Sequence, residues 1–417
     1  MPRRPGACPA GFSDVTLRRE IQIAWWHGAA RVAGKLRRRR WRARPWPARA
    51  AEKGVSVVIP SRNGRHLLAA QLPAIAAELE PLAAEIVIVD NGSEDGTAEW
   101  LRGAWPQALV ELSPEPLSFA RAVNRGIARA RFCHICLLNN DMAIAPGFFR
   151  ELERPFARVP DLFCATAQIR FPEGVRRQET GKAVMAQTSP EDFPIRCDEP
   201  FPGEDGSYVL YGSGGCSLYD AARLRALGAV DEAYAPAYVE DLDLGYRAWQ
   251  RGWPTVYVAG AVVEHRHRAT TSRYFTEPQL EQILETNHLR FLARAVADPR
   301  LFRRLWSQAL DRLRLLAGRS PAARHALRKA AGIALGGGPA DPPEYSEELF
   351  LALTNGDVAV FPGQARAGEP AVLQAGQLDT PPPEVLAKYV EVVLVRAASD
   401  LALRAAQEWT GRKWKVG

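Results

Sequence analysis

The sequence has few cysteines and no long apolar segment. Its six cysteines, in 417 residues, lack the regular spacing of a disulfide framework, which a chain of this length does not need. The first residues lack the apolar core of a secretory signal, and no uninterrupted apolar run approaches the roughly 18 residues of a membrane-spanning helix. We therefore expect reduced thiols and a cytoplasmic protein.

One Cys-x-x-Cys pair is present, Cys133 and Cys136, within the apolar run FCHICLL. Neither a second pair nor two histidines at zinc spacing accompany it. We interpret the two cysteines as strand residues and not as a metal site.

Acidic residues are scarce only at the N-terminus. Residues 1–53 contain 14 Lys and Arg against 3 Asp and Glu, so the remaining 40 basic and 44 acidic residues give that part a net charge of −4 within a total of +7. We therefore expect no nucleic-acid partner for the body. Trp25 and Trp26 beside clustered arginines suit a helix lying on an anionic membrane surface. A disordered basic arm and an RNA-binding arm are the alternatives.

Short β-branched runs alternate with helical patterns from Val55 to about Arg131, which predicts a βαβαβα order. Strand runs that are apolar on both faces are typical of a doubly wound, mostly parallel sheet covered by helices, so the fold class is α/β. We divide the chain into a basic N-terminal arm (1–53), an α/β domain (54–277), a helical extension (278–338) and a small α+β tail (339–417) of unknown role.

Polar side chains follow three of these strands. They are Ser61 to Gly64, Asp90 to Ser93, and Asn139 to Asp141. Because ligands of doubly wound sheets bind beyond the carboxyl ends of the strands, these segments predict a binding site. Further along, the pattern predicts a glycine-rich turn at Gly212 to Gly215 that leads into a helix from Asp220.

Six segments occur in a fixed order: VSVVIPSRNG, IVIVDNGSEDGT, FARAVNRGIARA, LLNND, VEDLDLGYR and VVEHRH. In this order they resemble the family-2 glycosyltransferases of the GT-A fold, over about residues 54 to 270, and most of all the rhamnosyltransferase-like branch that builds bacterial surface polysaccharides. The resemblance implies an inverting, metal-dependent transfer of a sugar from a nucleotide-sugar.

The resemblance places the donor at the strand ends. Asp90 is the expected ligand of the base or ribose, since a carboxylate there accepts hydrogen bonds from imide or hydroxyl groups. The alternative for Asp90 to Gly92 is a turn that caps the next helix. The residues that we expect to bind substrate are Pro60, Arg62, Asn63, Asp90, Asn91, Asn124, Asn140 and Gly214.

Asn139, Asn140 and Asp141 occupy the place of the family's DxD motif, of which only Asp141 is acidic. Oxygen ligands suit Mg²⁺ or Mn²⁺, and one carboxylate with phosphate oxygens and waters is an ordinary Mg²⁺ arrangement. By resemblance, His265 adds a further ligand; the alternative for this histidine is a structural or surface role.

Glu240 and Asp241 stand at the predicted start of a helix, where carboxylates act as caps or as catalysts. The resemblance favours catalysis, with Asp241 as the base that takes the acceptor's proton and Glu240 as the second candidate. Asp243 would face another side of the helix and serve structure.

The sequence thus predicts a glycosyltransferase that uses a UDP- or dTDP-sugar, with rhamnose suggested by the branch resemblance, and a glycan or lipid-linked hydroxyl acceptor at the inner face of the cell membrane. One alternative is a catalytically silent nucleotide-sugar-binding subunit, suggested by the altered DxD. Another is a nucleotidyltransferase, although its glycine- and lysine-containing phosphate loop is missing after the first strand.

Overall fold

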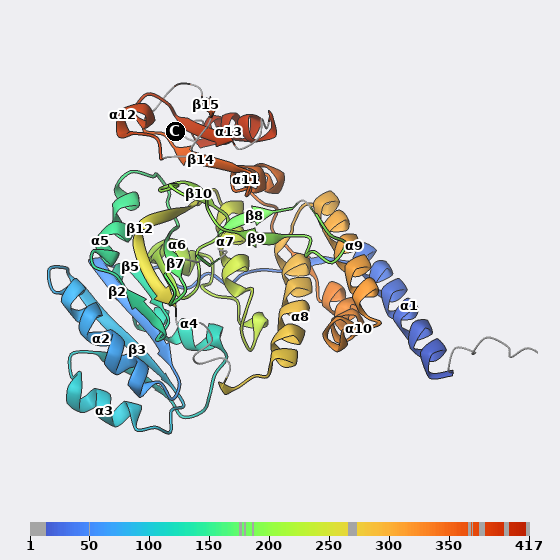
Figure 1. Cartoon of the computed structure of the whole chain (residues 1–417), viewed down its shortest axis with the longest axis horizontal. Helices are drawn as coiled ribbons and strands as arrows, with labels where there is room; N and C mark the ends of the chain where they lie inside the picture. The colour runs from blue at the N-terminus through green and yellow to red at the C-terminus, as the bar shows by residue number, and fades with distance from the viewer. Residues whose placement is uncertain are drawn as a thin grey trace, which may run out of the picture.

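The computed structural model describes residues 14–413 except residue 50 and the segments 175–176, 179–180, 186, 266–272, 366–367, 369, 375–379 and 396–399. Figure 1 shows a sheet domain, a block of helices beside it and a C-terminal unit packed over one end. Among the described residues, no helix has the length and apolar character needed to cross a membrane.

The sheet begins with four parallel strands. They are β2 (Glu52–Ser61), β3 (Ala84–Asn91), β4 (Leu109–Ser113) and β5 (Phe132–Leu138), in the spatial order β5-β2-β3-β4. The connecting helices are α2 (Arg65–Leu79), α3 (Thr97–Ala104) and α4 (Phe119–Arg129). The predicted βαβαβα order is therefore confirmed.

Both faces of these strands are buried. Val57 packs in the cluster that contains Leu68 of α2, whereas the next residue, Val58, packs in the cluster that contains Val123 of α4. Gly126 lets α4 approach β2, because a Cβ there would lie 2.2 Å from a methyl group of Val58. The helices thus cover opposite faces, as the uniformly apolar strands predict.

The second half of the sheet is mixed. Strand β11 (Cys216–Asp220) runs antiparallel between β5 and β7 (Cys164–Arg170), and β12 (Thr255–His265) continues parallel to β7. The edge is completed by β10 (Tyr208–Val209), and β6 (Met142–Ile144) pairs with β12.

The sequence interpretation left residues 216–219 unassigned between the glycine turn and the helix expected from Asp220; they form strand β11, and the helix is confirmed. CSLYD forms a strand first because it fills the gap between β5 and β7, and α6 (Ala221–Ala226) follows, capped by the side chain of Asp220. The other helices and strands of this half are α5 (Phe148–Glu153), η1 (Arg154–Ala157), β8 (Lys182–Val184), β9 (Arg196–Asp198), η2 (Glu232–Tyr234) and α7 (Glu240–Gln250).

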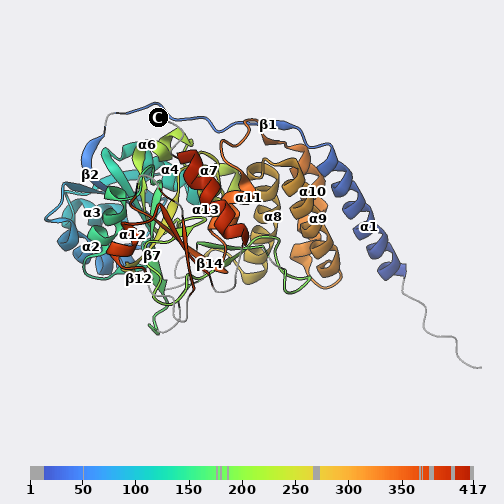
Figure 2. The same ribbon diagram turned by 90° about the horizontal axis from the view of Figure 1, so that it is seen from above.

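The helical extension consists of α8 (Glu277–Ala295), α9 (Pro299–Leu316) and α10 (Pro321–Leu335), and the N-terminal helix α1 (Asp14–Lys35) packs against α9 and α10. The indole of Trp306 donates to the carbonyl of Ala30 at 3.1 Å, and His27 contacts Asp311 at 2.8 Å. After α1, β1 (Arg39–Trp41) pairs with β13 (Gly338–Pro339), and the chain then runs along the outside of the molecule to β2 (Figure 2).

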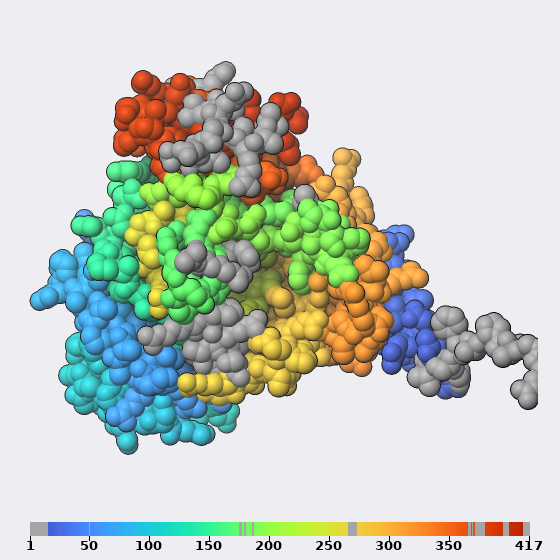
Figure 3. All heavy atoms as spheres, viewed as in Figure 1, coloured from blue at the N-terminus to red at the C-terminus, as the bar shows by residue number. Residues whose placement is uncertain are grey.

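The tail contains α11 (Glu347–Leu353), β14 (Val358–Pro362), β15 (Ala371–Gln374), α12 (Pro383–Leu386), β16 (Glu391–Val395) and α13 (Asp400–Lys413), with a three-stranded sheet β14-β16-β15. It covers one end of the body (Figure 3). Lys182, fully buried, joins tail and body: its ammonium lies 2.5 Å from Glu204 and donates to the carbonyl of Val358 at 2.9 Å.

Candidate active site

The carboxyl ends of β2, β3 and β5 bring the expected polar residues together. The register of the parallel pair places Ser61 beside Asp90, and the side-chain amide of Asn140, just beyond β5, donates to the hydroxyl of Ser61 at 2.9 Å. All three residues are buried. The arrangement follows from parallel pairing, since strands that run the same way end at the same edge.

Asp90 forms part of a turn but keeps acceptor capacity. Its Oδ1 accepts the amide N–H of Ser93 at 3.1 Å, and its second oxygen has no hydrogen bond among the described residues. The side chain is only 4 % exposed. A buried carboxylate with an unused oxygen suits a ligand that donates hydrogen bonds, such as a nucleobase or a ribose.

Arg62 and Asn63 lie beside Asp90, directly after β2, and contact Tyr274. The guanidinium of Arg62 stacks on the Tyr274 ring, 3.9 Å from its centroid, and the amide of Asn63 donates to the Tyr274 hydroxyl at 3.0 Å. The Nε atom of Arg62 is buried and has no hydrogen-bond partner. Pro60, the residue before Ser61, is half-buried in the same strand.

Asp141 and His265 face each other because β6 pairs with β12. In this antiparallel pair His265 lies opposite Met142, and His265 Nε2 is 3.7 Å from Asp141 Oδ2. The Nδ1 atom of His265 contacts Gln178 Oε1 at 3.0 Å. If Nδ1 carries the proton and donates it to Gln178, the lone pair of Nε2 is directed at Asp141. Metal-binding histidines commonly use this tautomer. Arg266 and His267, which complete the VVEHRH motif, lie outside the described residues.

These two side chains fit a divalent cation. The buried Oδ1 of Asp141 has no hydrogen-bond partner, which is costly unless a ligand satisfies it. The described residues contain no group of three or more acidic, histidine or cysteine side chains that could hold a metal ion. Any cation here would therefore take its remaining ligands from the substrate and from water.

The start of α7 is held in a strained backbone conformation. Tyr238 and Val239, just before Glu240, have φ angles of 74° and 77°, a region that β-branched and bulky residues rarely occupy. Asn287 of α8, itself 1 % exposed, stabilises this turn, because its amide donates to the carbonyls of Tyr234, Ala237 and Tyr238 at 2.8, 2.9 and 3.1 Å. Such strain persists where the surroundings fix it and is common at functional sites.

Asp241 is directed by this turn toward the glycine-rich segment. Its Oδ2 accepts the amide N–H of Gly214 at 3.3 Å, and its Oδ1 accepts that of Leu242 at 2.8 Å. The next glycine, Gly215, accepts the amide N–H of Asn139 at 2.8 Å, which brings Asp241 to the same edge as the Asn139–Asp141 segment. Burial raises the pKa of Asp241, although the backbone hydrogen bonds from Gly214 and Leu242 oppose this rise.

Glu240 is buried beside Asp241, and its Oε2 has no hydrogen-bond partner. Burial first, and then the negative charges of Asp241 and Asp243, raise the pKa of Glu240. Adjacent carboxylates with raised pKa values are a common arrangement in active sites, because a base works best with a pKa near the operating pH.

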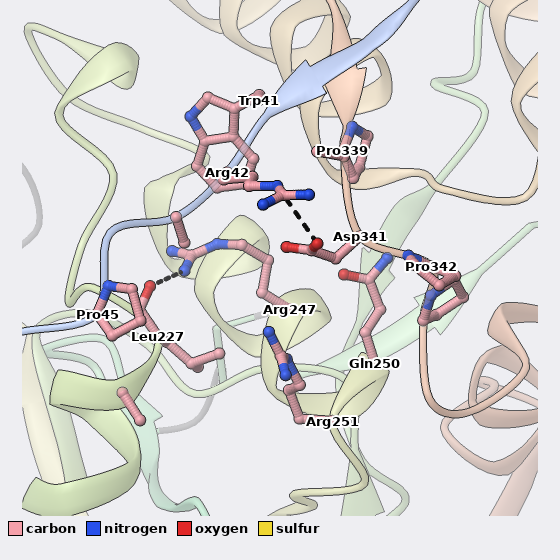
Figure 4. A pocket seen from close by; sticks show the side chains of 14 residues that line it. Trp41, Arg42, Pro45, Leu227, Arg247, Gln250, Arg251, Pro339, Asp341 and Pro342 are labelled. Carbon is pink, nitrogen blue, oxygen red and sulfur yellow. Dashed lines mark hydrogen bonds and ion pairs between the residues drawn. The ribbon is translucent and has the colours of Figure 1, made fainter.

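Asp243 stabilises the scaffold and does not face the site. Fully buried, it pairs with Arg247 at 2.7 Å and accepts the Tyr234 hydroxyl at 3.0 Å. Arg247 also donates to the carbonyl of Leu227 and lines a small cavity of about 60 Å³, where Trp41 and the ion pair of Arg42 with Asp341 close the space (Figure 4). This cavity belongs to the contact between the N-terminal segment and α7.

Residues 52–279 match the family described as Glycosyltransferase like family 2, which is more than half of the chain. The chain belongs to this glycosyltransferase family. Its doubly wound sheet, with antiparallel strands added beyond β5, is the GT-A fold expected from the sequence.

Two bacterial relatives of this glycosyltransferase are distant. The N-acetylglucosaminyl-diphospho-decaprenol L-rhamnosyltransferase of Mycobacterium tuberculosis is 28% identical over 212 residues, which cover 45% of this chain and 68% of that protein. The uncharacterized protein y4gI of Sinorhizobium fredii is 25% identical over 231 residues, 52% of this chain. The match spans a quarter of the length of y4gI, 25%.

Among solved structures, the mannosyltransferase PcManGT of Pyrobaculum calidifontis, in complex with GDP-Man and Mn²⁺, has 17% identity and a TM-score of 0.45, covering 76% of this chain and 86% of that one. TarS of S. aureus, residues 1–349 in complex with UDP-GlcNAc, has 13% identity and a TM-score of 0.42, with coverages of 63% and 72%.

Two residues that we expect to bind substrate form side-chain hydrogen bonds to other parts of the glycosyltransferase. Asn124 donates to the carbonyl of Val230 at 2.8 Å and to Glu232 at 3.2 Å, and accepts the Val230 N–H at 3.1 Å. Asn91 donates to the carbonyl of Leu117 and accepts its N–H, at 3.1 and 2.7 Å. These amides hold the loops that precede η2 and α4. The assignment of both residues to substrate binding stays a prediction.

Sequence reasoning did not identify Asn287, Gln178 or Tyr274 as contributors to the site. Asn287 lies in a helical pattern with no neighbouring motif, and Gln178 and Tyr274 stand in loops without a recognisable pattern. Each acts through a contact with a residue at least 49 positions away. Ser61, in contrast, ends β2 and belongs to the polar strand-end segments that the sequence predicts to form a binding site.

Proposed function

We propose that this chain is an inverting glycosyltransferase that transfers a sugar from a nucleotide-sugar to an acceptor hydroxyl, with Asp241 as the base. The observation that carries the proposal is the half-buried Asp241, held by Gly214 at the edge where the strand-end residues meet. Family membership supports the reaction class.

In the proposed step, Asp241 accepts the proton of the acceptor hydroxyl while the hydroxyl oxygen attacks the anomeric carbon. The bond from that carbon to the diphosphate oxygen breaks on the opposite face, the configuration inverts, and the nucleoside diphosphate leaves with the electron pair. The raised pKa of Asp241 makes it a stronger base than an exposed aspartate. The hydrogen bonds from the backbone amides of Gly214 and Leu242 keep the Asp241 carboxylate in its orientation during the transfer.

Asp90 is proposed to bind the nucleoside, with Arg62 and Asn63 beside it. Asp141 and His265 would hold Mg²⁺ or Mn²⁺, and such a cation, when bound, would offset the charge on the departing diphosphate. The support for this assignment is the buried Asp141 oxygen without a partner and the orientation of His265 by Gln178. Asn140 and Gly214 would line the space between donor and base.

We base the proposed donor sugar and acceptor on the rhamnosyltransferase of Mycobacterium tuberculosis. The name of the Mycobacterium tuberculosis relative supports L-rhamnose as the transferred group and a diphospho-decaprenol-linked acceptor. A dTDP- or UDP-sugar donor and a role in cell-surface glycan synthesis are further parts of the proposal. With an acceptor of this kind, the enzyme would work at the inner face of the cell membrane, in peripheral contact with it.

A catalytically silent nucleotide-sugar-binding subunit is the second candidate. One observation favours it: the DxD position contains the amides of Asn139 and Asn140 before its only carboxylate. The buried Glu240 and the half-buried Asp241 favour the enzyme, because a binding subunit has no need of carboxylates with raised pKa values.

The test compares wild type, Asp241→Asn and Asp141→Ala with a panel of UDP-, dTDP- and GDP-sugars, each with Mn²⁺ or Mg²⁺. We expect metal-dependent release of nucleoside diphosphate in the wild type, and a loss of at least about 1,000-fold in Asp241→Asn with donor affinity preserved. Donor binding without turnover on lipid-linked or glycan acceptors would favour the silent subunit. With added pyrophosphate, formation of a nucleoside triphosphate and a sugar phosphate from the nucleotide-sugar would identify a nucleotidyltransferase.

A further inference from the structure

Helix α1 is fixed in its rotation by contacts along one side. Ile23, Ala30 and Ala33 are buried against the helical extension, and the ion pair of Arg31 with Asp311, at 2.9 Å, adds to the contacts of His27 and Ala30. Figures 1 and 2 show α1 along the outer edge of that extension. The opposite side of α1 therefore faces outward.

That outward side is apolar. At 100° per residue, its five large side chains fall within an arc of about 100°, which makes them one continuous stripe. The stripe consists of Leu17 (55% exposed), Ile21 (60%), Trp25 (67%), Val32 (56%) and Leu36 (60%). A contiguous exposed apolar surface of this kind marks an interaction site, whereas single exposed leucines are ordinary.

A basic groove adjoins the stripe. It lies between α1, α8 and α10 and has a volume of about 490 Å³. Its lining, all of it within the described chain, includes no carboxylate and consists of Arg18, Arg19, Gln22, Trp26, Gln282, Pro321, Arg324, His325 and Arg328. Burial and the neighbouring charges of Arg328 and Lys329 lower the pKa of His325, as expected in positively charged surroundings.

We propose that the stripe and the groove together dock the protein on an anionic lipid bilayer, with the stripe at the level of the acyl boundary and the groove on phosphate headgroups. Tryptophan and aliphatic side chains gain free energy at this boundary, and arginines beside them gain from negative lipid charge. This inference rests on the proposed function in one respect, because it specifies the membrane contact proposed there. The residues that form the docking surface all lie in α1, α8 and α10, except Leu36, which directly follows α1.

A second copy of the chain is a poorer occupant of this surface. Packing stripe on stripe would bring Arg18 and Lys35, which lie at its borders by helical position, toward their counterparts in the other copy. Like charges facing each other oppose such a pair, whereas the same charges favour an anionic surface. Charge complementarity therefore favours an anionic bilayer over a second copy of the chain as the occupant of this surface.

The test measures co-sedimentation of the full chain with vesicles of phosphatidylglycerol and phosphatidylcholine, or of phosphatidylcholine alone, at low and high salt. We expect salt-sensitive binding to the anionic vesicles. The stripe variant Leu17→Ser/Ile21→Ser/Trp25→Ser should bind roughly tenfold more weakly or worse. Substituting glutamine for Arg18, Arg19, Arg324 and Arg328 should lower the affinity for anionic vesicles roughly fivefold for each charge removed.

Matched controls distinguish an effect of this surface from a general effect of removing exposed apolar or basic side chains. The apolar control changes the exposed Leu109, Leu112 and Leu401 to serine, and the charge control changes the exposed Arg102, Arg129, Arg150 and Arg251 to glutamine. Both should bind like the wild type. Equal binding of wild type and stripe variant, or no binding to anionic vesicles, would overturn the proposal.

A dimer in sedimentation velocity that the stripe variant converts to monomer would assign the stripe to a subunit interface and also overturn the proposal. Because vesicle binding is measured without donor or acceptor, its failure is distinct from a failure of the proposed glycosyl transfer. Circular dichroism of each variant verifies folding, which substitutions on exposed positions should preserve.

Discussion

The side-chain amide of Asn287 donates to the carbonyl of Tyr238 at 3.1 Å, and this contact connects the helical extension to the start of α7. Tyr238 and Val239 have left-handed backbone angles immediately before Glu240 and Asp241. The position of the proposed base thus depends on a residue outside the strand-end motifs, on a helix that packs beside the sheet domain.

Asn287→Leu should lower kcat by roughly 10- to 100-fold while leaving donor affinity within about threefold, because a small displacement of a catalytic group has a large effect on rate. Steady-state kinetics with separate measurement of donor binding tests this expectation. Thr286→Val is the control, since the side chain of Thr286, among the described residues, donates to the carbonyl of Gln282 in its own helix. A purely structural role for Asn287 would instead lower stability and leave kcat unchanged.

The pH dependence of turnover should reflect the raised pKa of Asp241, which burial causes. A base must be deprotonated to act, so kcat/KM should fall as the pH decreases, with a midpoint above the ordinary aspartate value of about 4. Profiles from about pH 3.5 to 8 test this. Glu240→Gln should retain activity within about tenfold, as the neutral form of Glu240 is favoured by its own raised pKa. A midpoint at or below 4 would refute the assignment.

Metal binding should depend on Asp141, His265 and, less directly, Gln178. We expect Asp141→Ala and His265→Ala to weaken Mn²⁺ binding, measured with a nucleoside diphosphate present, by roughly 100-fold or more. Gln178→Leu should weaken it roughly tenfold, because it frees the orientation of the imidazole. His134→Ala is the matched control, since His134 pairs with Glu153 on β5 and α5 at 3.4 Å. Equal Mn²⁺ affinity in His265→Ala and His134→Ala would remove His265 from the site.

Stability at acid pH should depend on His288. Burial first, and then Arg312, lower the pKa of His288 to about 3, below the value of about 6.5 in the unfolded chain. Below pH 6.5 the unfolded state therefore binds a proton that the folded state does not, and stability falls as the pH decreases. At pH 5.5 the loss from this group is about 1.4 kcal/mol.

The His288→Leu variant lacks this proton uptake. The loss in the free energy of unfolding between pH 7.5 and 5.5, measured with urea, should be smaller in His288→Leu than in wild type by about that amount. His325→Leu is a useful comparison, because His325 is less buried than His288 and should change the pH dependence less. Identical pH dependence in wild type and His288→Leu would disprove this account.

The parallel half of the fold was predictable because its signals are local. Val57 and Val58 pack on opposite faces, as a uniformly apolar strand requires, and parallel pairing then brings Ser61, Asp90 and Asn140 to one edge. Strand β11 was missed because its partners, β5 and β7, are distant in the chain and give CSLYD no local signature.

The amides show the limit of sequence reasoning most clearly. Asn91 ends β3, Asn124 lies in α4 and Asn140 follows β5, yet Asn124 and Asn91 bond to loop backbones while Asn140 bonds to Ser61. An asparagine has the same hydrogen-bonding groups in every case, and only the surrounding backbone determines its partner.

Local residue patterns were enough to predict the four parallel strands, the polar residues at their ends and the carboxylates that begin α7, because strand and helix periodicity and capping are properties of neighbouring residues. Three relationships become visible in the folded chain alone. His265 faces Asp141 through the pairing of β6 with β12, Asn287 holds the turn before Glu240, and α1 packs on α9 and α10 with its apolar stripe outward. These relationships join residues far apart in the chain, and long-range packing sets them without leaving a local pattern.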